Sequence, residues 1–385
     1  MAFNQNTGVY TPASGALTAA PGQVVQSAVW DAIFTDMTSA FTAAVQMTQG
    51  TYGQRNIIGM NGGFEVWQRG AGNSSSFSIG ASSTAYTADR WYIFTNANQA
   101  STVAAVTGIV NGSRVAAKVQ RNSGQTGTGL YNFGFPLDSD ECAAIQGQIV
   151  ALSFTAKAGA NWSPSGGQLV AQLAAGTGTP TKLFGGGGYT NTTTPINGVV
   201  ALTTTPTRFF FVSSAVPTTT TQAEVVIQWT PVGTAGADDS FTIDDVQLEI
   251  LPNATSPIAG FERWPFELMR ALCKRHYRKS FAYGVAPAQN AGLPGVATQV
   301  LAAAVSSVFW VQFNNISMRA TGAVTTFNPL ANNANANSNS VASTIAVSTD
   351  GFGLNTADQI VIYATVSGAS AGATAFIHWQ ADAGI

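Results

Sequence analysis

The chain is short of charge and of cysteine. Only 9% of its 385 residues are charged, with 16 Lys and Arg against 18 Asp and Glu, and the two cysteines are Cys142 and Cys273. A typical soluble domain carries about 25% charged residues. The net charge of −2 provides no basic field for a phosphate backbone, so we expect no nucleic-acid partner. Two cysteines so far apart in sequence predict neither a disulfide framework nor a zinc site.

Long apolar runs are also missing. No stretch of 18 apolar residues occurs, so we expect no membrane insertion. The first residues, MAFNQNTGVY, contain neither a basic nor an apolar signal region, and no secretory signal is predicted. An apolar content of 45% and an aromatic content of 10% exclude a disordered chain, and the length predicts two or three domains. With so little charge, the surface must consist of Ser, Thr, Asn, Gln and Gly, which is typical of β-rich or assembled proteins.

The N-terminal segment lacks basic residues and differs in pattern from the rest. Residues 1–54 contain no Lys or Arg, and residues 1–23 are rich in Gly, Pro, Ala and Thr, which predicts an extended arm. Apolar side chains then recur every four residues up to Gly50, which predicts an amphipathic helix. They are Val25, Val29, Ile33, Met37, Phe41 and Val45, with Trp30 and Phe34 beside them.

The spacing of this helix suggests a use for its apolar surface. A four-residue spacing drifts by about 40° per step around a helix of 3.6 residues per turn, so the apolar surface wraps around the helix. Such a helix packs either on its own domain or against copies of itself or another protein. The second interpretation makes residues 1–55 an anchoring and oligomerisation segment.

The remaining chain has a β pattern that is interrupted once. In residues 56–255, short alternating or apolar runs separated by Gly, Pro, Asn and Ser predict a jelly-roll β-sandwich. Its expected strands include Arg90–Phe94, Arg114–Gln120, Ile149–Ala156, Leu169–Leu173, Thr207–Val212 and Glu224–Trp229. Residues 256–281 predict a linker helix, because apolar residues follow helical spacing between Phe261 and Phe281, and a docking helix is the alternative use of this element. Residues 282–385 predict a C-terminal β-sandwich-like domain with strands at Val308–Phe313, Ile360–Val366 and Thr374–Gln380.

Two polar segments of these domains predict loops. The tetraglycine at 185–188 predicts a flexible loop, and residues 331–340 are too polar for a core. The expected fold class is therefore mainly β, made of an N-terminal anchoring arm and helix, a jelly-roll β-sandwich, a linker helix and a C-terminal β-sandwich-like domain.

The residues give little support for catalysis. The two histidines are His276, among Lys and Arg residues that would depress its pKa, and His378 in the expected last strand. A glycosidase would need two facing carboxylates. The acidic groups are Asp138, Asp140 and Glu141 in one expected turn, Asp238 and Asp239 in another, and the adjacent Asp244 and Asp245, whose side chains would point to opposite faces of a strand. We expect no enzyme, and a glycosidase stays the weaker alternative.

Three pairs of motifs, taken in order, resemble those of a known family. The motifs are NIIGMNGGFEVWQRG (56–70) with TADRWY (87–92), IDDVQLEILPNATSP (243–257) with FERWPFELMRALCKRHYRKSF (261–281), and ISMRATGAVTTFNP (316–329) with WQADAGI (379–385). Together they resemble phage virion appendage proteins, the tail-fibre or tail-spike-like proteins of bacterial viruses. The chain departs from that pattern at His276, where Tyr is usual, and at Gly384 and Ile385, where Glu and Leu are usual.

This resemblance implies a role on a virus particle. It implies a tail fibre that is made in the host cytoplasm, is located on the virion surface and contacts host surface polysaccharide for adsorption. Homotrimers are common in such appendages, and residues 1–50 would bind portal, adaptor, tail or capsid proteins. The alternatives are a head or collar fibre, a polysaccharide depolymerase tail spike, and a cellular carbohydrate-binding adhesin, which the lack of a signal disfavours.

The first sandwich also resembles carbohydrate-binding modules with a jelly-roll fold. That resemblance implies a structural calcium ion held by Glu65 and by Asp244 or Asp245, whereas a metal-free turn fixed by hydrogen bonds is the alternative. No cofactor is otherwise required. Sugar rings would stack on exposed aromatic side chains, for which the candidates are Trp67, Trp91, Tyr92, Trp162 and Tyr189. Core packing is the alternative for Trp67 and Trp91.

Overall fold

A computed structural model of the chain describes residues 2–4, 9–11, 56–96, 100–302, 307–313, 316–339, 345–350, 353–365 and 371–384. The chain divides into two compact units, residues 1–55 and residues 56–385. In the first unit, β1 (Ala2–Asn4) and β2 (Val9–Thr11) pair in antiparallel fashion. The predicted helix, with all eight of its apolar residues, lies outside the described residues and stays a prediction.

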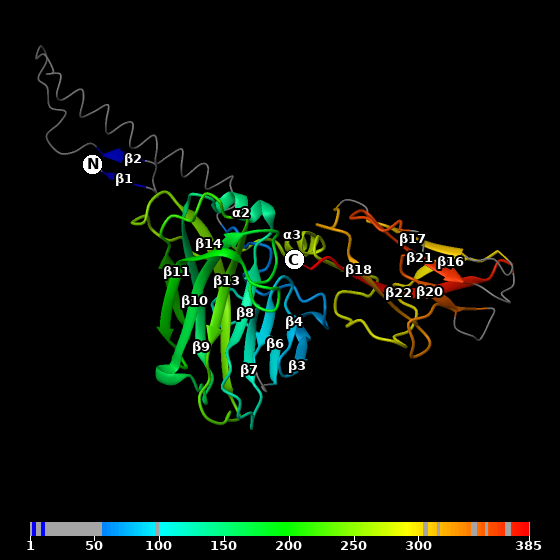
Figure 1. Ribbon diagram of the computed structural model, residues 1–385, viewed down its shortest axis with the longest axis horizontal. Helices are drawn as coiled ribbons and strands as arrows, with labels where there is room; N and C mark the ends of the chain where they lie inside the picture. The colour runs from blue at the N-terminus through cyan, green and yellow to red at the C-terminus, as the bar shows by residue number, and fades with distance from the viewer. Residues whose placement is uncertain are drawn as a thin grey trace, which may run out of the picture. The chain divides into compact units, whose positions relative to one another are not determined.

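The second unit begins with a sandwich of two antiparallel sheets (Figure 1). The first sheet has the order β12 (Thr207–Val212), β9 (Ile149–Ala158), β14 (Asp239–Leu251), β7 (Val115–Arg121), β6 (Ser101–Thr107) and β3 (Ser76–Ile79). The second has the order β11 (Thr190–Ala201), β10 (Gln168–Thr177), β13 (Gln222–Trp229), β8 (Tyr131–Pro136), β5 (Tyr92–Thr95) and β4 (Thr84–Tyr86). The mainly β fold class and the sandwich are thus confirmed.

Alternation along these strands places one large core between the two sheets. Phe154 of β9 and Phe241 of β14 meet Phe133 of β8 and Leu173 of β10 there, and all four side chains are fully buried. Burying an aromatic or leucine side chain of this kind contributes about 1.5–3 kcal/mol, so this shared apolar face holds the two sheets together.

The acidic residues that the sequence placed in a turn instead begin a helix. The helix α2 (Ser139–Ile145) starts at Asp138, whose side chain accepts hydrogen bonds from the backbone N–H groups of Asp140 and Glu141, each at 3.1 Å. The Glu141 carboxylate accepts the N–H of Asp138 at 2.8 Å, which completes a capping box. The carboxylates of Asp138 and Glu141 therefore serve to cap the N-terminus of α2.

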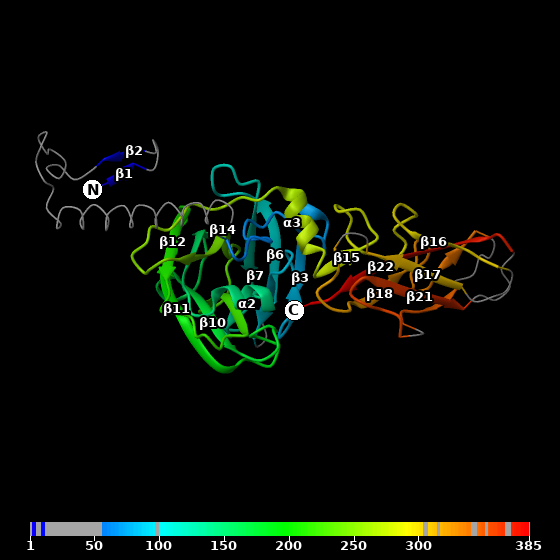
Figure 2. The same ribbon diagram turned by 90° about the horizontal axis from the view of Figure 1, so that it is seen from above.

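The linker helix is shorter than the sequence predicts. The helix α3 spans Phe266–Cys273 and buries Met269 and Cys273, one turn apart, against Val66. The chain then turns and forms β15 (Tyr277–Lys279), which pairs with the last strand of the chain. The expected helix over the second half of residues 261–281 is therefore wrong, because the backbone there forms sheet hydrogen bonds. Figures 1 and 2 place α3 between the first sandwich and the C-terminal strands.

The C-terminal strands build two small antiparallel sheets with a core of their own (Figure 2). The last strand, β22 (Thr374–Asp382), pairs with β15, β16 (Ala297–Val300), β18 (Ala323–Phe327) and β19 (Asn337–Ser338). The other sheet has the order β17 (Ser307–Gln312), β21 (Gln359–Thr365) and β20 (Ala346–Ser348). The polar segment 331–340 is not an exposed loop throughout, because Asn337 and Ser338 form β19 and are buried against β22.

Candidate functional site

The aromatic residues predicted to bind sugars divide into buried and half-buried side chains. Trp67, Trp91 and Tyr92 are 0% exposed, so none of them offers a ring face to a ligand, which corrects the expectation of exposed platforms there. The Trp91 ring packs 4.9 Å from the rings of both Phe64 and Phe133. Trp67 and Trp91 are therefore core residues, as the core-packing alternative predicts.

The other two candidates are half-buried and lie apart from each other in the chain. Trp162 donates its indole N–H to the Gly167 carbonyl at 2.9 Å and packs against the Trp229 ring. The Tyr189 hydroxyl donates to the Thr181 carbonyl at 2.9 Å, inside the loop between β10 and β11. In the part of the chain that the structure describes, neither ring packs against an exposed aromatic ring, and the partners of Trp162 are the buried Trp229 and Phe241.

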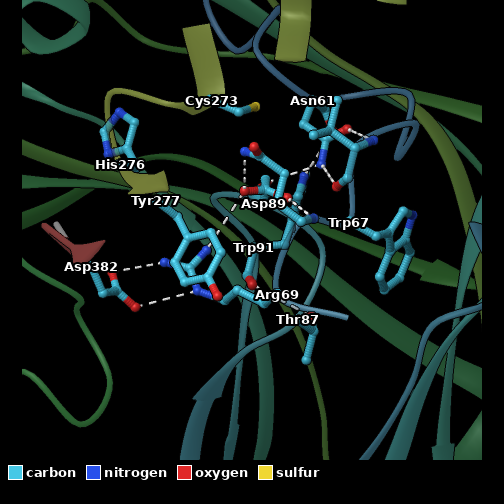
Figure 3. Close-up of polar contacts among 12 residues, drawn as sticks. Asn61, Trp67, Arg69, Thr87, Asp89, Trp91, Cys273, His276, Tyr277 and Asp382 are labelled. Atoms are coloured by element: carbon cyan, nitrogen blue, oxygen red, sulfur yellow. Dashed lines mark hydrogen bonds and ion pairs between the residues drawn. The ribbon is translucent and has the colours of Figure 1, made fainter. Parts of the chain in front are cut away.

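The motifs that carry the family resemblance converge at one place, shown in Figure 3. The Asn61 side chain accepts the Val66 N–H at 2.9 Å and donates to the carbonyls of Val66 and Asp89, at 2.8 and 3.0 Å. The Asp89 carboxylate accepts the N–H of Gln68 at 2.5 Å and its side-chain amide at 3.1 Å. The first motif pair thus forms one hydrogen-bonded unit within the chain itself.

Arg69 joins this unit to the C-terminal strands. Its guanidinium donates to the Asp382 carboxylate at 2.8 and 3.3 Å and lies 3.8 Å from Asp89. The same guanidinium is stacked between the rings of Tyr86 and Tyr277, each 4.5 Å away. We call Arg69, Tyr86, Asp89, Tyr277 and Asp382 the motif junction. Its groups are paired with one another, which indicates a structural role.

Burial controls the protonation of the groups at and near the motif junction. It raises the pKa of Asp89 to about 6, and the charge of Arg69 opposes that rise. His276 is 2% exposed, and burial followed by the charge of Arg90 holds its pKa well below the ordinary value. A neutral imidazole that contacts the Gly384 carbonyl at 3.2 Å is a packing group at physiological pH.

The residues proposed to hold calcium do not fit the ion. The guanidinium of Arg263 lies 2.6 Å from the Asp245 carboxylate and 3.5 Å from that of Glu65, so a cationic side chain of the protein occupies the space between them. Asp244 instead accepts the N–H of Ile109 at 3.1 Å and that of Asp245 at 2.8 Å. Within the described residues, no group of three or more His, Cys, Asp or Glu side chains could hold a metal ion.

A row of polar groups lies on the outward face of the second sheet. Gln228 of β13 donates to Gln172 of β10 at 3.4 Å, and Gln172 donates to Asn197 of β11 at 2.9 Å. These side chains alternate along their strands with core residues such as Leu173 and Ile227, so they point away from the core. We call Asn132, Gln172, Asn197, Glu224 and Gln228 the amide face.

The amide face ends at a buried acid. Glu224 is 0% exposed, and its carboxylate accepts hydrogen bonds from the Tyr92 hydroxyl at 2.7 Å and from Asn132 at 3.1 Å. Burial raises the pKa of Glu224 to about 7 despite these bonds. Gly134 leaves the space they need, because a Cβ there would overlap both Glu224 and the Tyr92 ring.

The loop between β10 and β11 covers this end of the amide face. The Leu183 N–H donates to Glu224 at 2.8 Å, and the Phe184 N–H donates to the Tyr92 hydroxyl at 3.1 Å. The charge of Glu224 also raises the pKa of both Tyr92 and Tyr189, although burial is the larger cause for each. One of the predicted aromatic residues, Tyr92, thus holds an acid that local sequence patterns did not single out.

The sequence contained a signal for these missed residues. In the predicted strand Glu224–Trp229, Glu224, Val226 and Gln228 alternate with the apolar Val225, Ile227 and Trp229, so one face of that strand is partly polar. The pattern did not reveal that Gln172 and Asn197 lie beside Gln228, because strand order is set by tertiary pairing.

Comparison with known proteins gave structural likeness only. No protein-family model matches the sequence, and no curated protein matches it significantly. A bacteriophage CBA120 tailspike protein 4 enzymatically active domain is similar at a TM-score of 0.29 and 13% identity, over 51% of this chain and 21% of that one. A family 22 carbohydrate-binding module of Clostridium thermocellum Xyn10B has a TM-score of 0.29 and 14% identity, over 44% and 89% of the two chains. TmCBM61, solved with β-1,4-galactotriose, has a TM-score of 0.29 and 14% identity, over 51% and 100%.

The α-helices α2 and α3 have 7 and 8 residues. None of those the structure describes combines the length and the apolar character needed to cross a bilayer.

Proposed function

We propose that this chain binds polysaccharide through the amide face. The observation that carries the proposal is the row of side-chain amides Gln228, Gln172 and Asn197, which continues into the group of Asn132 and Glu224. Each amide offers both a donor and an acceptor, which is what the hydroxyl groups along a sugar chain require. Gln172 and Gln228 are half-buried and Asn197 is exposed, so a ligand can reach them.

Binding without hydrolysis is part of this proposal. Hydrolysis of a glycosidic bond needs two carboxyl groups about 5–9.5 Å apart. The second sheet of the first sandwich has six described strands, and Glu224 is the one carboxylate on their outward face. The backbone of Leu183 and Phe184 covers it. Its hydrogen bonds fix Tyr92, Asn132 and the loop, so we assign it a positioning role.

The amide face predicts a specific loss of binding on mutation. Gln172→Ala in the full chain should weaken binding to a retained polysaccharide about tenfold, because each lost hydrogen bond contributes about 0.5–1.5 kcal/mol. Affinity electrophoresis in gels containing galactan, xylan or dextran measures this directly. The matched control is Gln148→Ala, an exposed amide in the turn before β9. Equal retardation of both variants, or no retardation of the wild type in any of the gels, would contradict the proposal.

We further propose that the protein is a virion appendage, a tail fibre in the first place and a head or collar fibre in the second. The support is the order of the three motif pairs, together with a separate N-terminal unit of residues 1–55 that leaves residues 56–385 compact by themselves. In this proposal the apolar helix residues from Val25 to Val45 form a homotrimer and attach it to portal, adaptor, tail or capsid proteins. The sandwiches then contact host polysaccharide at the particle surface.

The trimer can be tested by native mass. The full chain should have about three times the 39.8 kDa of a single chain, and deletion of residues 1–50 should reduce the mass to one shortened chain, because the buried apolar surface is lost. Light scattering after size-exclusion chromatography gives both masses. A full chain that elutes as a single copy would rule out the trimer, and a deletion that leaves the trimer intact would rule out the helix as its cause.

A further inference from the structure

A cationic cavity lies between α3 and the C-terminal strands. Its volume is about 130 Å³, and its lining includes Arg270, Lys274, Arg278, Lys279, Tyr283 and Trp379. Four of these residues belong to the basic stretch in which six of the 16 Lys and Arg occur, between Arg263 and Lys279. The charge asymmetry of the sequence is thus concentrated at one hollow in the surface.

Carboxylates balance the positive charge of this cavity only in part, since Asp89 acts on Lys279 and Glu267 on Lys274. Arg270 pairs with Glu267 at 3.4 Å, but the Glu267 side chain is 77% exposed. Arg278 donates to the carbonyls of Lys274 and Ile316. Among the described residues, no carboxylate forms an ion pair with Lys274, Arg278 or Lys279.

The lysines are electrostatically disfavoured in their present surroundings. Burial, and then the charges of Arg270 and Arg278, lower the pKa of Lys274. Burial also lowers the pKa of Lys279 to about 8, although the charge of Asp89 opposes that shift. The Lys279 ammonium donates to the carbonyls of Gly70, Tyr283 and Val285. An anion in the cavity would stabilise these charged forms, because opposite charge nearby favours ionisation.

The cavity also has an apolar wall. The Tyr283 ring lies 5.5 Å below the Arg270 guanidinium, and its hydroxyl is fixed by donating to the Glu65 carbonyl at 3.0 Å. Trp379 of β22 lines the same space. A mixed wall of rings and cations suits a ligand that combines a carboxylate with C–H groups better than it suits a small inorganic anion. The volume has room for about four waters, enough for a carboxylate and the adjoining ring atoms of a sugar.

We infer that this cavity binds the acidic sugar residue of a polysaccharide, such as a uronate, with Lys274 and Arg270 contacting its carboxylate. The inference rests on the proposed polysaccharide binding and adds to it a second site that selects acidic chains. Lys274 is half-buried, and no hydrogen-bond acceptor for its ammonium occurs among the described residues, so this group is available to a ligand.

The test is a titration of the full chain with oligogalacturonate, the neutral oligogalactose and inorganic phosphate, followed by calorimetry at low salt. We expect oligogalacturonate to bind at least tenfold more tightly than either of the other two. Lys274→Gln should weaken oligogalacturonate binding about tenfold, the usual effect of losing one charge-assisted hydrogen bond. The matched control is Lys157→Gln, which removes the same charge from β9 and should have no effect. Arg270→Gln is a second cavity variant in case Lys274→Gln does not fold.

The outcomes separate this inference from the proposed function. Equal binding of oligogalacturonate and oligogalactose, or equal affinities of Lys274→Gln and Lys157→Gln, would overturn the cavity site while leaving the amide face unaffected. Phosphate binding as tight as oligogalacturonate binding would overturn the sugar assignment. A Gln172→Ala variant that binds neutral polysaccharide normally, while Lys274→Gln loses oligogalacturonate, would overturn the amide face and support the cavity.

Discussion

Arg90→Met is expected to destabilise the protein by about 3–5 kcal/mol. The Arg90 guanidinium forms a two-point pair with Glu141, at 2.8 and 3.1 Å, and the two side chains are 1% and 9% exposed. It also donates to the Pro136 carbonyl at 2.7 Å and stacks 4.5 Å from the Phe135 ring. Removing one partner of a buried pair leaves the other charge without compensation, which costs about 3–5 kcal/mol.

Urea unfolding followed by tryptophan fluorescence measures this loss. The double variant Arg90→Met with Glu141→Gln should recover much of the stability, because no uncompensated charge remains and glutamine can still serve in the capping box. The matched surface control is Arg275→Met, whose pair with Asp140 spans 3.8 Å between side chains that are 37% and 86% exposed. That change should cost less than about 1 kcal/mol. A loss in Arg90→Met no larger than in Arg275→Met would show that the buried pair is not the cause.

Arg69→Met is expected to uncouple the two sandwiches. The substitution removes both bonds to Asp382 and both ring contacts, so β22 loses its ion pair with the first sandwich. The bond from Lys279 of β15 to the Gly70 carbonyl remains. It also leaves Asp89, which is 1% exposed, without its cation. We expect a loss of about 3–5 kcal/mol near neutral pH and two separate unfolding transitions where the wild type has one.

The loss in Arg69→Met should grow with pH. In the folded chain the pKa of Asp89 is about 6, above its ordinary value of 3.8. The folded state therefore binds the proton of Asp89 more tightly than the unfolded state does. The resulting contribution to the free energy of unfolding is complete below pH 3.8 and is lost as the pH rises through 6. Without Arg69 the folded pKa rises further, and ionising the buried acid becomes more costly. Calorimetry at pH 5 and pH 8 should therefore show the larger deficit at pH 8.

Arg69→Lys provides the matched control for this prediction. It keeps the charge near Asp89 but loses the planar fork that reaches Asp382, so it should be intermediate in stability and nearly independent of pH relative to the wild type. A deficit of Arg69→Met that is equal at both pH values would mean that Asp89 is not the group left uncompensated. A single transition in that variant would mean that other contacts couple the sandwiches.

Local sequence patterns were sufficient for the fold class. The predicted run Thr207–Val212 coincides with β12, and the run Glu224–Trp229 lies within β13. Such runs can be recognised locally because successive side chains of a strand point to opposite faces of the sheet. The helix over residues 261–281 was predicted too long, since the helical spacing continues to Tyr277 although β22 pairs with the backbone there. The pairing partner lies about a hundred residues away and leaves no trace in the local pattern.

The sequence by itself determined a mainly β chain with little charge and few of the residues that catalysis uses, because composition and short-range periodicity need no knowledge of contacts. Tertiary structure decided what each motif residue does. Trp67 and Trp91 are buried in the core, and the Arg263 guanidinium lies where calcium was proposed. Arg69 forms a hydrogen bond with Asp382, which is 313 residues away in the sequence. Tertiary structure also assembled the amide face, since Gln228, Gln172 and Asn197 become neighbours only through the order of β13, β10 and β11. These roles depend on burial and on contacts between residues far apart in the sequence, and both arise only when the sheets pack together.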